Sequence, residues 1–202
     1  MYVLAVTGGL GAGKTTATDF MRSRGAVVLS LDDIARRQLE PGTPVFNRIV
    51  QIFGPGVLDG DGRIDADVLA ADAFSSALRA RQLNAIVHPA VLREVAPGLT
   101  EMGLLPNPPR IVAIDIPLLV EAPVFAELAD DVLAISAPEE MRVERAVARG
   151  MSEADVRARI ACQATDAERE AMANHVIVND TTLDEFHERL SRFWDDVIDD
   201  GP

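Results

Sequence analysis

The chain has 202 residues, of which 48% are hydrophobic and 25% are charged, and its formal net charge at pH 7 is −13. This composition indicates a soluble globular protein with one sizeable core, and the acidity argues against nucleic acid or an anionic membrane as a partner. Since no apolar run is long enough to span a membrane and no signal peptide is recognisable, we expect a cytoplasmic protein; its oligomeric state is open, with a monomer favoured.

The chain begins with a predicted strand over residues 2–7, a glycine-rich turn and a helix over residues 15–24. The turn has the pattern G-x-x-x-x-G-K-[ST] of a phosphate-binding P-loop, and its Lys14 is the only lysine of the chain. In such a loop, backbone N–H groups and the lysine surround a polyphosphate, and the hydroxyl of Thr15 is placed for Mg²⁺. The order of strand, turn and helix indicates that this turn binds ATP or a similar nucleotide. The alternative is a glycine-rich turn that binds no nucleotide. The predicted nucleotide contacts here are Gly11, Ala12, Gly13, Lys14, Thr15 and Thr16.

Four more short apolar strands are predicted, and they alternate mostly with helical patterns. They cover residues 26–30, 110–116, 131–136 and 175–179. This alternation predicts an α/β fold with a parallel sheet of about five strands and helices on both faces.

The stretch between the second and third of these strands contains no comparable apolar strand. Its helical periods cover residues 45–53, 66–74 and 75–95, so we expect an inserted, mostly helical lobe. An acidic turn from Asp59 superficially resembles a calcium loop. However, Ala70 stands where such a loop needs glutamate, which favours a tight turn. The single cysteine, Cys162, excludes an intrachain disulfide and a cysteine-based zinc cluster.

Asp115 lies near the carboxyl end of a predicted buried strand, the edge that faces the ligand crevice in an open α/β sheet. We therefore predict that it binds Mg²⁺ together with Thr15; a strand-end capping residue is the alternative. The motifs by which GTPases recognise guanine are absent, which favours a small-molecule kinase.

Arginines are concentrated in the region after residue 138. Arg142, Arg145 and Arg149 have the spacing of one helix face, and Arg157 and Arg159 follow on the next helix. Guanidinium groups on a closing lid would neutralise charge on a transferring phosphoryl group, and we predict that Arg145 and Arg149 do so. A solvated face paired with the neighbouring glutamates is the alternative.

The chain resembles the dephospho-CoA kinase family in segments that follow the family's order along nearly its whole length. These segments cover residues 7–16, 32–44, 61–74, 83–89, 116–121, 149–163 and 176–179. The resemblance implies ATP-dependent phosphorylation of the ribose 3′-hydroxyl of dephospho-CoA, with ATP, Mg²⁺ and dephospho-CoA as ligands. It implies one P-loop kinase domain over residues 1–202, with a core at 1–31, 107–138 and 164–202, an acceptor-binding lobe at 32–106 and a lid at 139–163.

The same resemblance extends to individual residues. It implies that Asn179 contacts the nucleotide. We predict Lys14 of the P-loop and Arg145 as catalytic residues, together with Asp32 as the carboxylate next to the position of the family's base. The histidine of the pair His88-Pro89 would by itself indicate a helix start or a packing residue; the resemblance places it in the acceptor lobe.

Ser30 departs from the family pattern, because the family usually has Asp-x-Asp here and the first Asp is the candidate base. A serine hydroxyl is no general base at neutral pH. Three explanations are open: Asp32 or Asp33 substitutes, positioning suffices for a loose transition state, or the protein is slow or inactive. The alternative functions are accordingly another P-loop kinase of a small hydroxyl acceptor and a ligand-binding homologue with little turnover.

Overall fold

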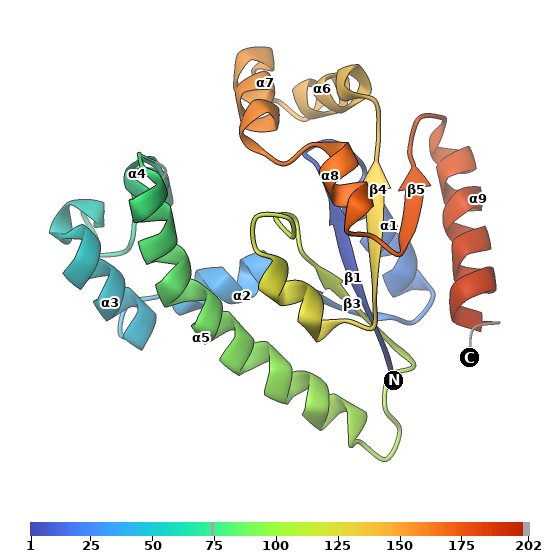
Figure 1. The fold of residues 1–202 in the computed structure, drawn as a ribbon, viewed down its shortest axis with the longest axis horizontal. Helices are drawn as coiled ribbons and strands as arrows, with labels where there is room; N and C mark the ends of the chain where they lie inside the picture. Colours follow the sequence, from blue (N-terminus) through green and yellow to red (C-terminus); the bar gives the residue numbers. More distant parts are fainter. Residues whose placement is uncertain (74, 200–202) are drawn as a thin grey trace. The chain divides into compact units, whose positions relative to one another are not determined.

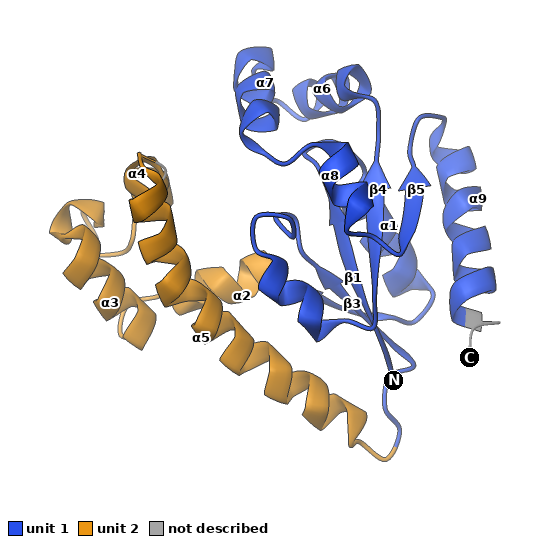
Figure 2. Cartoon of the chain, in the orientation of Figure 1, with its two compact units in different colours: residues 1–30, 107–202 blue, residues 31–106 orange. Residues whose placement is uncertain are grey.

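The computed structural model describes residues 1–73 and 75–199. Phe74, the last residue of the predicted helix over 66–74, and residues 200–202 at the end of the predicted domain lie outside the described residues. The chain divides into two compact units (Figure 2). One comprises Met1–Ser30 and Asn107–Pro202, and the other Leu31–Pro106.

The first unit is built on a five-stranded sheet, which confirms the predicted α/β class (Figure 1). Its strands are β1 (Tyr2–Gly8), β2 (Val27–Ser30), β3 (Ile111–Asp115), β4 (Asp131–Ser136) and β5 (His175–Val178). All pairs are parallel, and the order is β2-β3-β1-β4-β5. The strand before the P-loop is therefore central, and Asp115 at the end of β3 is in register with Val6 of β1 and Ser30 of β2.

Both faces of the sheet are buried at its central strands β1, β3 and β4. Leu4 and Val6 of β1 pack in a cluster with residues of α1 (Lys14–Ser23) and α9 (Leu183–Phe193). The alternate residues Val3 and Ala5 are equally inaccessible. Because neither face of these central strands is exposed, they are continuous apolar runs rather than alternating ones, whereas the edge strands β2 and β5 expose Val27, Val176 and Val178.

Three helices follow β4, namely α6 (Glu139–Ala148), α7 (Glu153–Cys162) and α8 (Asp166–Ala171). The side chain of Ser152 caps α7 by accepting a hydrogen bond from the N–H of Asp155. Arg157 of α7 donates two hydrogen bonds to Glu140 of α6, at 3.0 and 2.8 Å, and these lower the pKa of Glu140. Cys162 ends α7 and is exposed.

The second unit is helical, as predicted. It contains α2 (Leu31–Gln38), α3 (Pro44–Phe53), a short 3₁₀ turn (Pro55–Val57), α4 (Ala66–Ala73) and α5 (Ala77–Gly103). Val45, Ile49 and Leu69 are among its buried core residues. The Asp59 carboxylate accepts the N–H groups of Asp61 and Arg63, both at 2.9 Å, which confirms the tight turn.

The predicted end of the helix over 75–95 is wrong, since α5 continues through Pro97 to Gly103. The interpretation of His88-Pro89 as a helix start is also wrong, because both residues lie inside α5. The reason is packing: Val91, Val95 and Leu99, four residues apart, are buried on one side of α5. Burial of this stripe offsets the loss of the backbone hydrogen bonds that the prolines inside α5 cannot donate.

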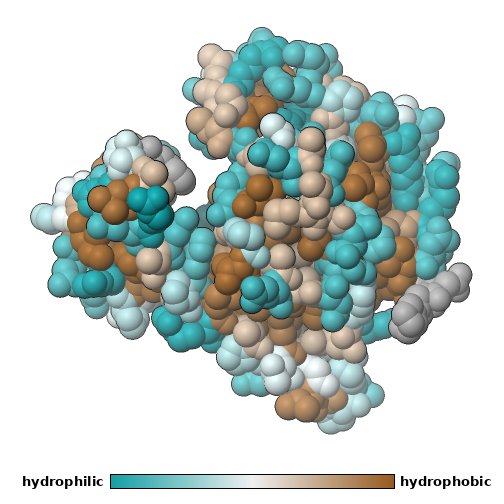
Figure 3. Space-filling model, viewed as in Figure 1, coloured by the Kyte–Doolittle hydropathy of each residue, from teal (hydrophilic) through white to brown (hydrophobic). Residues whose placement is uncertain are grey.

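The surface in view is mainly hydrophilic, with small hydrophobic areas between polar ones (Figure 3). Among the residues that the structure describes, Leu104, just after α5, is the most exposed large apolar side chain. In the described part of the chain, none of the helices combines the length and the apolar character that crossing a bilayer requires.

Candidate active site

The P-loop connects β1 to the first turn of α1. Gly13 precedes α1 with φ of 105°, in the left-handed region that favours glycine. A Cβ at Gly13 would also collide with the Asn179 side chain. No described side chain caps α1, so its first N–H groups are left for an anion, the arrangement by which helix N-termini bind phosphate.

Lys14 and Asp115 are brought together at the carboxyl ends of β1 and β3. The ammonium group of Lys14 donates a hydrogen bond to Oδ1 of Asp115, and their side chains are 14% and 21% exposed. Asp115 thus neutralises the P-loop lysine in this structure, rather than capping a strand. Both groups remain accessible from the crevice edge of the sheet.

The oxygen atoms of Thr15 and Asp115 suit Mg²⁺. Thr15 is exposed in the first turn of α1, and Asp115 is partly exposed. Among residues 1–73 and 75–199, no group of three or more His, Cys, Asp or Glu side chains could enclose a metal. Mg²⁺ bound with nucleotide needs only one or two protein oxygens, because phosphates and water supply the rest, so this donor set fits.

Asn179, directly after β5, links three parts of the site. Its side-chain amide donates to the carbonyl of Ala12 at 2.8 Å, and its backbone N–H donates to the carbonyl of Ser136 at 2.7 Å. Arg145 of α6 donates to the backbone carbonyl of Asn179 at 3.1 Å and to its side-chain oxygen at 3.2 Å. Asn179 therefore holds the P-loop, the end of β4 and Arg145 of α6 in one network.

The three arginines predicted to share a face of α6 have different environments. Arg142 is buried and ion-paired with Asp166, Arg145 is half-buried against Asn179, and Arg149 is exposed just after the helix. The solvated-face alternative holds instead for Arg157, which pairs with three glutamates: Glu139, Glu140 and Glu153.

Sequence reasoning missed several residues around the P-loop. Asp166 of α8, partly exposed, pairs with the buried Arg142 and Arg169, and no motif distinguishes Asp166 or Arg169. The nearest sequence signal is the capping box of Thr165 and Glu168, which fixes the start of α8. Gln163, before α8, accepts a hydrogen bond from the N–H of Leu10 at 3.2 Å.

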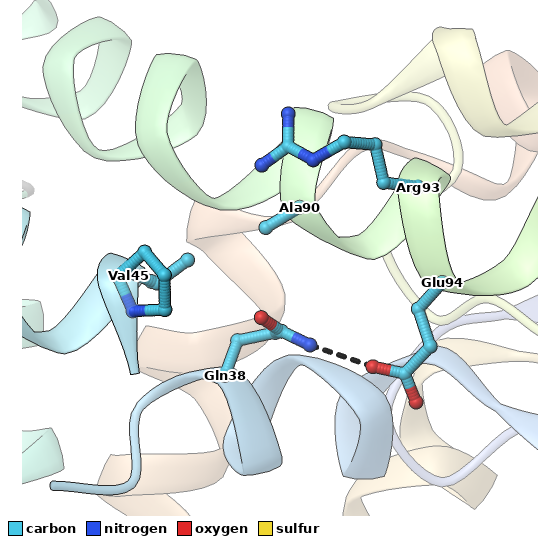
Figure 4. A pocket seen from close by; sticks show the side chains of 6 residues that line it. Gln38, Val45, Ala90, Arg93 and Glu94 are labelled. Atoms are coloured by element: carbon cyan, nitrogen blue, oxygen red, sulfur yellow. Dashed lines mark hydrogen bonds between the residues drawn. The ribbon is translucent and has the colours of Figure 1, made fainter. Parts of the chain in front are cut away.

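The second unit by itself contains Asp32, which the sequence predicts to be catalytic, and a cavity. Asp32 is exposed in the first turn of α2. The cavity has a volume of about 260 Å³ and is lined by Gln38, Pro44, Val45, Ala90, Arg93 and Glu94. Gln38 of α2 and Glu94 of α5 point toward one another across it and share a hydrogen bond of 2.6 Å (Figure 4). His88 lies half-buried in α5, where burial lowers its pKa.

Comparison with known proteins identifies relatives along the whole chain. Residues 2–185 match the family model described as dephospho-CoA kinase. A dephospho-CoA kinase of Corynebacterium diphtheriae is 39% identical over 193 residues, which cover 95% of this chain and 94% of that protein. A dephospho-CoA kinase of Thermobifida fusca is 38% identical over 198 residues, which cover 98% of this chain and 96% of that protein.

Solved structures agree with these matches. TT1252 from Thermus thermophilus has a TM-score of 0.82 and 34% identity, with 97% of each chain covered. The dephospho-CoA kinase from Campylobacter jejuni, at 21% identity, has a TM-score of 0.71 and coverage of 99% of this chain and 98% of that chain, and supports the fold. Shikimate kinase from Acinetobacter baumannii, with a TM-score of 0.54, 14% identity and coverage of 99% and 94%, has a similar fold. The chain therefore belongs to the dephospho-CoA kinase family.

Proposed function

We propose that this protein transfers the γ-phosphoryl group of ATP to the ribose 3′-hydroxyl of dephospho-CoA, which yields coenzyme A and ADP. The observation that carries the proposal is the P-loop, whose Lys14 is paired with Asp115 at the crevice edge of the sheet, in a chain of this family. The substrates also support a cytoplasmic location, and a monomer remains our prediction.

Catalysis in this scheme depends on positioning and on neutralising charge. The N–H groups of the P-loop and of the first turn of α1 would bind the phosphates, with Lys14 as a mobile positive charge near the transferring group. Thr15 and Asp115 would hold Mg²⁺, which neutralises charge between the β- and γ-phosphates when bound. Arg145, held by Asn179, and Arg149 after α6 would supply guanidinium groups from the lid.

The acceptor hydroxyl would be activated by Asp32. Ser30, at the end of β2, has no basic group, and Asp32 is the first carboxylate after it, in the exposed first turn of α2. Asp32→Asn should lower kcat by about 10²–10⁴-fold, the usual effect of removing a general base. Asp33→Asn is the matched control, since Asp33 is exposed and pairs with Arg36 at 2.8 Å. If only the Asp33 variant lost kcat, Asp33 rather than Asp32 would be the general base.

Steady-state turnover of the purified protein with Mg-ATP and dephospho-CoA tests the proposal. We expect turnover of about 1–100 s⁻¹, with the new 3′-phosphate identified by mass. A clear preference for another hydroxyl acceptor would overturn the substrate assignment. Tight binding of both ligands without turnover would identify a degenerate kinase, and Ser30→Asp would then be expected to restore activity.

A further inference from the structure

Two buried arginines share a single carboxylate beside the P-loop. Nη1 of Arg142 lies 2.8 Å from Oδ1 of Asp166, and Nη1 of Arg169 lies 3.1 Å from the same oxygen. The arginine side chains are only 6% and 2% exposed. Because guanidinium groups do not lose their protons in proteins, this triad of Arg142, Asp166 and Arg169 combines two positive charges with one negative charge.

The hydrogen bonding of the triad is incomplete within the described residues, although the exposed carboxylate of Glu168 is close enough for Arg169 to help lower its pKa. Nε of Arg142 and both Nε and Nη2 of Arg169 are buried, and none has a hydrogen-bond partner there. Burying a charged donor without a partner is unfavourable, and an apolar or neutral contact would join the same elements more favourably. The excess of positive charge therefore needs an explanation other than packing.

The triad lies directly against the phosphate-binding backbone. A Cβ at Gly9 would collide with Nη1 of Arg142 and would lie 3.2 Å from Nη1 of Arg169. The guanidinium group of Arg142 therefore approaches Gly9 more closely than a side chain there would permit, and that of Arg169 lies next to it. They come from α6 and α8, which follow β4 at the end of the sheet to which its arrow points (Figure 1).

We propose that the Arg142–Asp166–Arg169 triad is a fixed positive charge behind the P-loop that stabilises the polyphosphate of ATP without touching it. Arg169 is a positioning residue in this scheme: its charge acts through the P-loop backbone and through Asp166. Asp166 orients both guanidinium groups and leaves one net positive charge. The inference rests on the ATP-binding part of the proposed function and not on the identity of the acceptor.

Charge variants separate this role from a merely structural one. Arg169→Met leaves the neutral pair of Arg142 and Asp166, so the dissociation constant for ATP, measured by calorimetric titration without acceptor, should rise roughly tenfold. Asp166→Asn combined with Arg169→Met leaves only Arg142 charged and so restores one net positive charge. We expect this double variant to bind ATP within about threefold of the wild type, although it lacks both ion pairs.

The matched control is Arg24→Met, which removes the same charge from a partly exposed arginine after the far end of α1. It should leave ATP affinity unchanged. Thermal unfolding without nucleotide shows whether each variant is folded, and Arg169→Gln replaces Arg169→Met if the latter does not fold. Unchanged affinity in the Arg169 variant, or a double variant that binds ATP more weakly than the single one, would overturn the inference.

The same titrations keep this inference separate from the proposed reaction. If the wild type binds ATP but does not phosphorylate dephospho-CoA, the proposed substrate is wrong and the charge series still decides the role of the triad. If the wild type does not bind ATP, both proposals fail.

Discussion

Replacing Asp115 by asparagine should change nucleotide affinity and turnover in opposite directions. In the structure, Lys14 is ion-paired with Asp115, whereas in the proposed reaction it contacts the phosphates of ATP. ATP must therefore displace this pair when it binds. Asparagine preserves the shape of the side chain but removes the charge that holds Lys14 away from the nucleotide.

The magnitude follows from the partial burial of the pair. With side chains 14% and 21% exposed, the pair lies between a surface and an interior ion pair. Two charges 4 Å apart attract by about 4 kcal/mol at an effective dielectric constant near 20, and solvation of the separated groups offsets much of this. A net of about 1–2 kcal/mol remains, which corresponds to about 5–30-fold tighter binding of ATP without Mg²⁺.

Turnover with Mg-ATP should fall by about 10²–10³-fold, because the variant lacks the carboxylate proposed to hold Mg²⁺. Affinity is measured by calorimetric titration of ATP in EDTA, and turnover by release of ADP. Asp19→Asn is the control, since Asp19 is an ion-paired but exposed residue of α1. If Asp115→Asn binds metal-free ATP no more tightly than the wild type, the pair does not compete with the nucleotide and the reasoning fails.

Three further predictions concern other contacts. Asn179→Ala removes the donor of the buried Ala12 carbonyl, so we expect a loss of about 1–3 kcal/mol in the free energy of unfolding and weaker ATP binding; unchanged ATP affinity would contradict this. Burial and the hydrogen bond to Asp131 raise the pKa of Tyr2, so its contribution to stability is complete below the unfolded pKa of about 10 and is lost as the pH rises through the higher folded pKa. Because Tyr2 is the only tyrosine, absorbance at about 295 nm follows it directly, and identical titration of the folded and the urea-unfolded protein would refute the shift. Arg93→Ala should raise KM for dephospho-CoA about 5–10-fold but leave KM for ATP within about twofold, since Arg93 lines the cavity of the second unit; an equal effect of Arg81→Ala, an exposed arginine of the same helix, would refute a specific role.

The strands of the sheet could be predicted because each one is recognisable from its own short stretch of sequence. Strands buried on both faces are short apolar runs, and the parallel order follows from their alternation with helices. Asp115 could be identified as a site residue because it ends such a run. The end of α5 could not be predicted locally, since Pro97 indicates a helix boundary and only the packing of Leu99 beyond it shows that the helix continues.

The lid arginines show where spacing alone is insufficient. Intervals of three and four placed Arg142, Arg145 and Arg149 on one face, but they do not show what that face contacts. In the structure, Arg142 and Arg145 contact different partners, Asp166 and Asn179, from segments more than 20 residues away. Such long-range contacts have no periodic signature in the sequence, so the surroundings of these arginines could be identified only from the fold.

The P-loop itself combines both kinds of information. The motif requires glycine so that backbone N–H groups can turn toward a phosphate, and the φ of Gly13 agrees with that requirement. Gly9 has no such φ, but a side chain there would collide with the guanidinium group of Arg142 and would lie 3.2 Å from Nη1 of Arg169. One glycine of the loop is thus explained by backbone conformation, and the other by charge packed behind the backbone. If the triad acts as proposed, the second glycine is as much a part of phosphate binding as the first, because it sets how closely that charge approaches the nucleotide.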